Sequence, residues 1–350
     1  MEGPSVPHRP AGAVVVSRRR RGWVRPAGVA AAVLVAGCVA TACGTAEESD
    51  ARPVTLMLNW TPNAHHVGIY AALAQGWYDD AGIDLTVVEP ADAGVEQAVA
   101  SGAAQVGLAQ AESLLPARAA GVPVVSVATV LPVNDSALFG LASDGIDRPA
   151  DLAGTRYGGF GGALETEIIS ALVECDGADP SEVEFVTIGN VDYLAGLQAD
   201  QFDTAWVFSG WDVLRAEQVE GVDTTQIRFS DWLGCIPNWY TPVVLTSTTL
   251  AESDPDLVRD VLAVTARGYA LAEDDPAGAA ELMLGEVPEL DPELVRASVA
   301  YYAPRFSDGE WGVQDEQTWL DFAGFLLSAA VVDEPVDAAA AFTNEFLPGG

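Results

Sequence analysis

The sequence predicts an α/β protein of two lobes joined by two crossovers of the chain. Short β-rich runs alternate with helical runs, which is typical of largely parallel sheets covered by helices. The alternation restarts near Asp144, where a second α/β unit begins. After residue 246 the chain is almost entirely helical, and so many helices need a sheet to cover. We therefore expect them to return to the first lobe.

Glycine and proline punctuate these runs and mark where the helices end. In the first unit we expect strands at residues 54–58, 83–88, 105–108 and 122–130, with helices at 68–75, 95–101 and 113–119. In the second unit we expect strands at 155–157, 183–188 and 204–208, with helices at 163–174, 193–199 and 212–219. A strand at 241–246 then precedes helices at 255–272, 276–284, 292–300, 314–329 and 336–346. Lobe 1 would thus comprise residues 54–143 and 243–350, and lobe 2 residues 144–242.

The first 43 residues have the features of an export signal. Basic residues at 18–21 precede an apolar run at 28–39, which is shorter than the roughly 20 residues of a membrane-spanning helix. Cys38 and Cys43 each follow small residues, an arrangement that resembles the signal peptide of bacterial lipoproteins. We expect lipidation at Cys43, because a polar tether, residues 44–53, follows it, with Cys38 as the alternative. The protein would then be anchored to the outer face of the cell membrane by lipid alone.

An ordinary secretory leader remains an alternative to the lipoprotein signal. The run RRGWV at residues 20–24 also fits a twin-arginine signal, so the sequence does not choose between the two export routes.

The charge balance is strongly acidic. The chain has 51 acidic residues, 16 arginines and no lysine, for a formal net charge of −35. Such a surface repels phosphate backbones and anionic lipid headgroups, which argues against nucleic acid as a partner and against electrostatic docking on membranes. We interpret the acids as a solvated coat whose self-repulsion salt would screen.

Beyond the leader the chain has two cysteines, Cys175 and Cys235. An exported protein can pair them in a disulfide or bury both as thiols, and the sequence does not choose between these states.

The sequence offers no metal or catalytic motif. His65 and His66 are the only histidines beyond the leader, and as neighbours they point in different directions on a helix or a strand. Neither a Cys-x-x-Cys nor a His-Glu-x-x-His spacing occurs, and no Gly-x-Ser-x-Gly elbow is present. We expect no metal, no cofactor and no catalytic residue. One histidine would be structural, and His66 would hydrogen-bond a ligand.

A glycine-rich run, GGFGGALE at residues 158–165, separates a predicted strand from a predicted helix. Helix N–H groups meet ligands at such positions in open α/β sheets, and glycine allows close approach of the backbone. Leu164 departs from the dinucleotide-binding pattern. We expect Gly161 and Gly162 to offer N–H groups and Glu165 to accept an amine N–H; the alternative is a tight turn without a ligand.

Aromatic residues cluster at strand ends and in loops. A planar ligand is best held between two aromatic faces, one from each lobe. We expect Trp60 to provide one face and Trp239 or Tyr240 the other, with Phe160 as the next candidate. The ligand's edge nitrogens would hydrogen-bond with Asn59, His66 and Glu165.

Four stretches of the sequence carry a family resemblance. They are VTLMLNWTPNAHHVGIYAALAQGWYDDAGIDLTVVEP, SGAAQVGLAQAESLLPARAAGVPVVSVA, TRYGGFGGALE and NWYTPVVLTSTTL. The chain from residue 54 onward resembles the extracytoplasmic solute-binding proteins of ABC importers, in the branch that binds hydroxymethylpyrimidine and formylaminopyrimidine. The resemblance implies a type II periplasmic-binding-protein fold, a monomer, and delivery of a thiamin-precursor pyrimidine to permease subunits. Relatives that bind riboflavin, sulfonate or nitrate leave those ligands as alternatives, as does an exported enzyme.

A related pyrimidine synthase shares this fold and uses a lysine that binds pyridoxal phosphate and a histidine that it consumes. In the register of SGAAQVGLAQAESLLPARAAG, these positions are Ala109 and Ser113. The synthase's cysteine-rich motif corresponds to residues 234–239, where only Cys235 is a cysteine. We therefore expect a binding protein and not an enzyme.

Overall fold

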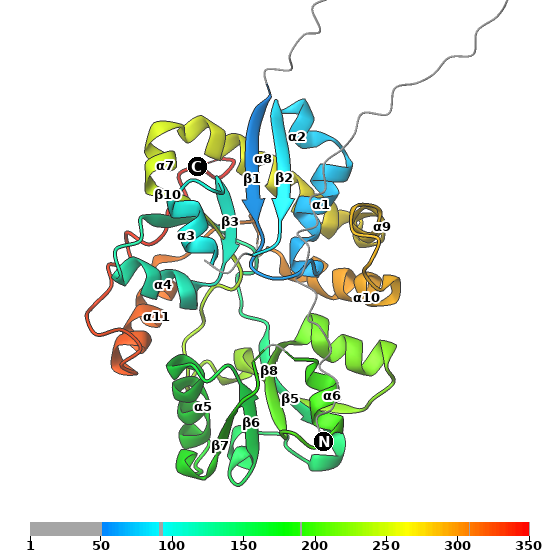
Figure 1. The fold of residues 1–350 in the computed structure, drawn as a ribbon, viewed down its shortest axis with the longest axis vertical. Helices are drawn as coiled ribbons and strands as arrows, with labels where there is room; N and C mark the ends of the chain where they lie inside the picture. The colour runs from blue at the N-terminus through cyan, green and yellow to red at the C-terminus, as the bar shows by residue number, and fades with distance from the viewer. Residues whose placement is uncertain (1–50, 91–93, 190, 308, 350) are drawn as a thin grey trace, which may run out of the picture.

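The computed structural model describes residues 51–90, 94–189, 191–307 and 309–349, and it divides into two α/β lobes (Figure 1). Both expected lipidation sites, Cys38 and Cys43, lie outside the described residues. The first lobe is built on a five-stranded sheet. In spatial order its strands are β2 (Ile83–Val88), β1 (Arg52–Met57), β3 (Val106–Ala109), β10 (Val243–Ser247) and β4 (Val124–Thr129).

The second lobe repeats this topology. Its strands, in spatial order, are β7 (Glu184–Thr187), β6 (Arg156–Gly159), β8 (Thr204–Phe208), β5 (Ser136–Leu141) and β9 (Thr224–Arg228). In each sheet the strand that follows a crossover runs antiparallel to its neighbours, namely β10 in the first and β5 in the second. The chain thus passes between the lobes twice, from β4 to β5 and from β9 to β10 (Figure 1).

The first crossover lies earlier in the chain than the sequence indicated. β5 belongs to the second sheet, so the crossover occupies residues 130–135 instead of falling near Asp144. β5 and β9 were not predicted as strands. The run SALFGL of β5 is buried on both faces, so it lacks the alternation that marks a half-exposed strand. β9 was not predicted for the opposite reason, because its TTQIR sequence is largely polar.

The C-terminal helices return to the first lobe, as predicted. α8 (Pro255–Asp274) crosses α1 (Val67–Ala74) where two glycines meet. A Cβ atom on Gly268 would lie 1.9 Å from the carbonyl oxygen of Gly68, so only glycine allows this close approach. The other helices are α2 (Trp77–Asp80), α3 (Val95–Ala100), α4 (Ala111–Ala119), α5 (Ala163–Cys175), α6 (Tyr193–Gln198), α7 (Thr248–Ser253), α9 (Pro276–Glu286), α10 (Pro292–Tyr302) and α11 (Glu316–Ser328).

Two predicted helices differ in the structure. Residues 212–219 form π-helical turns, η5 (Ser209–Val213) and η6 (Arg215–Val219). Residues 336–346 contain no helix; instead Phe342 forms a parallel bridge with Ser126 at the edge of β4. The backbone hydrogen bonds of this bridge cover an otherwise open sheet edge, which outweighs the helix propensity of the alanines.

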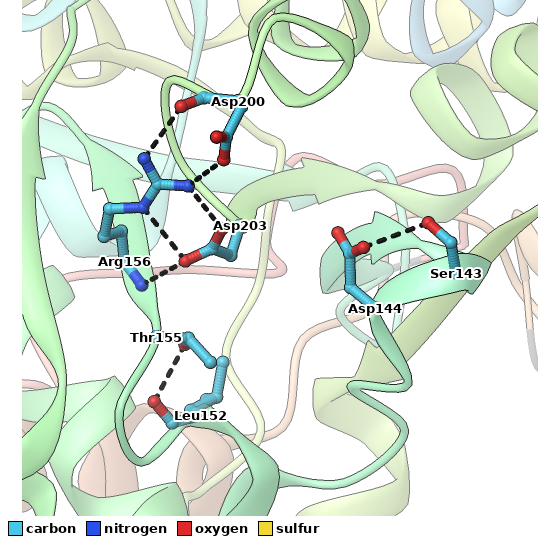
Figure 2. Close-up of polar contacts among 7 residues, drawn as sticks. All are labelled: Ser143, Asp144, Leu152, Thr155, Arg156, Asp200 and Asp203. Carbon is cyan, nitrogen blue, oxygen red and sulfur yellow. Dashed lines mark hydrogen bonds and ion pairs between the residues drawn. The ribbon is translucent and has the colours of Figure 1, made fainter.

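The base of the second lobe is fixed by Arg156, at the start of β6 (Figure 2). Its guanidinium donates to Asp203 at 2.6 and 3.1 Å and to the carbonyl oxygen of Asp200 at 2.7 Å, and it also pairs with the Asp200 carboxylate. These contacts tie β6 to the loop that enters β8. The glycine-rich run leaves the opposite end of β6.

Cys175 and Cys235 form a disulfide, which resolves the choice that the sequence left open. It links the last residue of α5 to the segment that leads into the second crossover. Within the described ranges, no helix has both the length and the apolar character needed to cross a membrane.

Candidate ligand-binding site

A cavity of about 550 Å³ lies between the lobes. It is lined by residues that follow the carboxyl ends of strands in both sheets, where ligands bind in open α/β folds. From the first lobe come Asn59, Trp60, His65, Gln110, Glu112 and Ser113. The second lobe contributes a largely aromatic wall that includes Tyr157, Phe160, Tyr193, Trp206, Phe208 and Trp211. Among the described residues that line the cavity, none is an arginine.

The two adjacent histidines have different environments, and the expected ligand contact through His66 is contradicted. His66 is fully buried; its Nδ1 accepts the N–H of Asn63 at 3.2 Å, and its Nε2 lies 2.9 Å from Oδ1 of Asn59. Nε2 therefore carries the proton and donates to Asn59. Burial, and then the neighbouring His65, lower the pKa of His66 to about 3, so the ring is neutral. His66 is structural, and it leaves the amide NH₂ of Asn59 to face a ligand.

His65 is the histidine that lines the cavity. Its ring packs between Phe208 of the second lobe and Tyr302 of α10, with centroids 5.1 and 4.5 Å away. Burial lowers its pKa to about 3, and its Nε2 is buried without a hydrogen-bond partner. An uncharged imidazole with one free nitrogen thus lies where the lobes meet.

The glycine-rich run forms a closed loop around Glu165. One carboxylate oxygen accepts the Tyr157 hydroxyl at 2.9 Å, and the other accepts the N–H groups of Phe160 and Gly162, each at 3.0 Å. Both oxygens of Glu165 are therefore occupied, and the N–H of Gly162 is too. Gly161 has φ of +79° and does not line the cavity. Glu165 and Gly162 thus hold the loop, and both also line the cavity, so the expected contact of these two residues with a ligand stays a prediction.

The loop exposes Phe160 in the cavity. Phe160 is 53 % exposed and Trp60 is 40 % exposed, unusually high for large aromatic side chains. They come from different lobes and both line the cavity. Trp60 and Phe160 are therefore available as the two aromatic faces.

The other two expected aromatic residues do not reach this cavity. Trp239 is buried and stacks on Phe322 of α11 at 4.9 Å. Tyr240 is also buried, and its hydroxyl accepts the N–H of Asp315 at 2.8 Å. The expectation that either one forms an open ring face is contradicted, because α11 covers both.

Trp206, Phe208 and Trp211 line the cavity but were not among the residues expected to contact the ligand. Trp206 and Phe208 share one face of β8, since they are two residues apart on a strand, and Trp211 follows in η5. The same alternation in TAWVF that predicted the strand at 204–208 could have indicated that both rings point to one side.

Asp135, in the first crossover, connects this wall to the first lobe. One carboxylate oxygen accepts the hydroxyl of Tyr301 at 2.7 Å, and the other accepts the hydroxyl of Tyr302 and the N–H of Gly210, both at 2.8 Å. Burial raises the pKa of Asp135, while these three donors oppose the rise. The network holds η5 against α10 and so positions Phe208 and His65.

Two half-buried carboxyl groups also line the cavity, Glu112 from lobe 1 and Asp212 from lobe 2. Burial raises the pKa of Glu112, in the first turn of α4, to about 8, against the opposing effects of a backbone N–H and the Trp239 indole. Among the described residues, its Oε2 has no hydrogen bond of good geometry. Burial raises the pKa of Asp212, in η5, to about 6; the N–H of Phe208, at 3.2 Å, opposes this shift. Neither residue was predicted.

Comparison with known proteins gives both a family and a fold. The family model described as NMT1/THI5 like matches residues 63–279. The chain is 30 % identical to a Legionella pneumophila protein named 4-amino-5-hydroxymethyl-2-methylpyrimidine phosphate synthase, over 84 % of this chain and 92 % of the relative. It is 26 % identical to the formylaminopyrimidine-binding protein of Halalkalibacterium halodurans, over 86 % of this chain and 92 % of the relative.

Among solved structures, the periplasmic aliphatic sulphonate binding protein of Escherichia coli has a TM-score of 0.66. The match covers 85 % of this chain and 94 % of that one at 13 % identity, so it shows the fold alone. The predicted periplasmic-binding-protein fold is confirmed.

Proposed function

Since the chain belongs to the NMT1/THI5-like family, we propose that it is the solute-binding protein of an ABC importer and that its ligand is a thiamin-precursor pyrimidine. It would bind the pyrimidine in the interlobe cavity and deliver it, chemically unchanged, to permease subunits. Closure of the lobes over the ligand would be the state that the permease recognises.

The observation that carries this proposal is the composition of the cavity. Exposed rings from both lobes flank a 550 Å³ space whose described lining includes uncharged polar groups and no arginine. Planar nitrogen heterocycles match such a lining, because rings stack on aromatic faces and edge nitrogens hydrogen-bond to polar groups. Sulfonate and nitrate sites usually recruit arginine, so an anion fits less well.

In the proposed complex, Trp60 and Phe160 enclose the two faces of the pyrimidine. The amide NH₂ of Asn59 donates to the ring edge, since His66 occupies its oxygen. Stacking and a few hydrogen bonds in a closed cleft support dissociation constants from about micromolar to nanomolar, roughly −8 to −12 kcal/mol.

The residues that replace the synthase's reactive side chains favour binding over catalysis. Ala109 is buried in β3 and has no nucleophile, and the chain has no lysine to take its place. The hydroxyl of Ser113 lies within hydrogen-bonding distance of the carboxylate of Glu96 and of the carbonyl oxygen of Gln110. A serine held in this way does not supply the ring atoms that a consumed histidine would.

The export signal and the disulfide between Cys175 and Cys235 support an extracytoplasmic location, because structural disulfides persist in oxidising compartments. Lipidation at Cys43, or at Cys38, would keep the receptor beside its permease.

A calorimetric screen of the purified protein tests the proposal. The ligands are 4-amino-5-hydroxymethyl-2-methylpyrimidine, formylaminopyrimidine, thiamin, riboflavin, taurine and nitrate. We expect binding of a pyrimidine at micromolar concentration or tighter, and weakening of about 10-fold to 100-fold in Trp60→Ala with the fold intact. Binding of taurine without any pyrimidine, or turnover of the pyrimidine, would overturn the proposal.

A further inference from the structure

Glu112 is a carboxyl group on the cavity, and one of its oxygens has no hydrogen bond of good geometry among the described residues. It lies in the first turn of α4, directly after β3, and lines the interlobe cavity. Its Oε2 is shielded from solvent and makes no hydrogen bond of good geometry to any residue that the structure describes. Buried polar atoms are nearly always paired in folded proteins, so an unpaired carboxyl oxygen beside a cavity requires an explanation.

No cation accounts for Glu112. It forms no ion pair with any arginine among the residues that the structure describes. Its polar neighbour is the indole of Trp239, whose Nε1 also lacks a hydrogen bond of good geometry. Glu96, nearby, is a like charge. A structural role as half of a salt bridge is therefore excluded for the described chain.

Such an environment favours the neutral acid. Burial, with a smaller contribution from Glu96, raises the pKa of Glu112 to about 8, against the opposing effects of a backbone N–H and the Trp239 indole. At pH 7 the group is then mostly a carboxylic acid, with one O–H donor and one carbonyl acceptor side by side. The ligand edge that matches this pair is a ring nitrogen next to an amine.

We propose that Glu112 is the specificity-determining residue for an aminopyrimidine, its O–H donating to a ring nitrogen while its carbonyl oxygen accepts an N–H of the adjacent amine. This inference rests on the proposed function and narrows it to heterocycles that have this amidine-like edge. Two parallel hydrogen bonds in a buried site discriminate strongly, since an analogue without the amine leaves the carboxyl unpaired.

The pH dependence of binding follows from the protonation state. Above pH 8 Glu112 loses its proton, the O–H donor disappears, and affinity for an uncharged aminopyrimidine falls about 10-fold for each further pH unit. Three other cavity groups do not change their protonation state between pH 7 and 10. His65 has a pKa of about 3, Asp212 of about 6 and Tyr193 of about 12. Burial raises the pKa of Tyr157 further still. The remaining acids that face this region are Glu96 and Glu165.

Two ligands and two variants of the full protein test the inference by calorimetry. The ligands are 4-amino-5-hydroxymethyl-2-methylpyrimidine and an analogue with a methyl group in place of the amine. We expect the wild type to prefer the amine by about 10-fold to 100-fold. Glu112→Gln keeps a donor and an acceptor, so it should retain the preference and lose the fall in affinity above pH 8. Glu112→Leu should bind both ligands about equally.

The outcomes separate this inference from the proposed function. If the wild type binds neither pyrimidine, the proposed function fails and the inference fails with it. If the wild type binds the amine and Glu112→Leu keeps the full preference, only the inference is overturned. Should Glu112→Leu not fold, Glu112→Gln decides: the same loss of affinity above pH 8 as in the wild type would refute a role for the Glu112 proton.

Discussion

Glu112 from lobe 1 and Asp212 from lobe 2 are half-buried carboxyl groups on the cavity, and the two differ in charge at neutral pH. Burial raises the pKa of both, but Asp212 receives the N–H of Phe208 and lies near Arg215, which limit its pKa to about 6. At Glu112 a backbone N–H and the Trp239 indole also oppose the rise, but the nearby charge is the like charge of Glu96, and the pKa reaches about 8. At pH 7 the lobe 2 carboxyl is mostly ionised and only accepts hydrogen bonds, whereas the lobe 1 carboxyl also donates.

The side chains that line the cavity around these two groups also differ between the lobes. The lobe 1 wall is mostly polar and is fixed by local hydrogen bonds, as His66 fixes Asn59. The lobe 2 wall is mostly aromatic, and Glu165 and Asp135 hold its loops. We infer that lobe 1 recognises the ligand's edge and lobe 2 covers its face, so that a ligand needs both lobes to bind tightly.

Of the substitutions proposed, His66→Ala should destabilise the protein most, because His66 fixes the lobe 1 side of the cavity. It removes a fully buried ring and leaves the N–H of Asn63 and the oxygen of Asn59 unpaired. We expect the free energy of unfolding to fall by about 2–4 kcal/mol, measured by urea denaturation.

His65→Phe is the matched control for this experiment. Phenylalanine retains the packing against Phe208 and Tyr302. It removes both ring nitrogens, of which Nε2 has no hydrogen-bond partner among the described residues, so we expect a change of about 1 kcal/mol or less. Equal destabilisation by the two substitutions would contradict the different roles of the two histidines.

Replacing Glu112 or Asp212 by its uncharged amide should raise the free energy of unfolding, and the gain should differ between the two lobes. Both acids have folded-state pKa values above their ordinary values of 4.5 and 3.8, so the folded protein holds more protons and stability falls as pH rises. That loss spans about pH 4 to 6 for Asp212 and about pH 4.5 to 8 for Glu112. At pH 8 we expect Glu112→Gln to gain about 1–3 kcal/mol of unfolding free energy and Asp212→Asn about 1–2 kcal/mol.

Urea denaturation of the wild type and both variants between pH 4 and 9 measures these gains. Below pH 4 the differences should vanish, since both carboxyls are then protonated in either state. A Glu112→Gln variant that is less stable than the wild type at pH 8 would show that the carboxyl is paired in solution.

The sequence predicted much of the fold because its pattern is local. The predicted strands at 83–88 and 204–208 coincide with β2 and β8, and the helices after residue 246 return to lobe 1. β5 escaped prediction because it is buried on both faces, and this moved the first crossover. Residues 336–346 were predicted as a helix because nothing in them indicates the sheet edge that they cover.

The site was harder to predict because it depends on contacts distant in the chain. Trp60 and Phe160, which follow strand ends, do line the cavity, and their stacking on a ligand stays a prediction. Trp239 was not, because Phe322 of α11 buries it. The choice between His65 and His66 depends on the hydrogen bond to Asn59, and Glu112 has no sequence motif that distinguishes it from the many surface acids.

Phe160→Ala should weaken the lobe 2 wall without affecting the fold. Phe160 is 53 % exposed, so we expect less than 1 kcal/mol of destabilisation. Loss of one stacking face should weaken pyrimidine binding about 10-fold by calorimetry. Leu233→Ala is the control, because Leu233 is also exposed in lobe 2 but does not line the cavity. An unchanged affinity in Phe160→Ala would assign the stacking to another ring of this wall.

The effect of salt on stability should come from the exposed acids of the surface and not from Glu112 and Asp212 on the cavity. The coat's self-repulsion is screened over about 3 Å at 1 M salt, compared with about 10 Å at 0.1 M. We expect the melting temperature to rise by a few degrees between these concentrations, because the net charge of −35 is dominated by exposed acids. Buried groups are screened much less, so Glu112→Gln and Asp212→Asn should show the same rise as the wild type. If either substitution abolished the rise, the salt effect would originate in the cavity, and the surface charge would be a minor cost to stability.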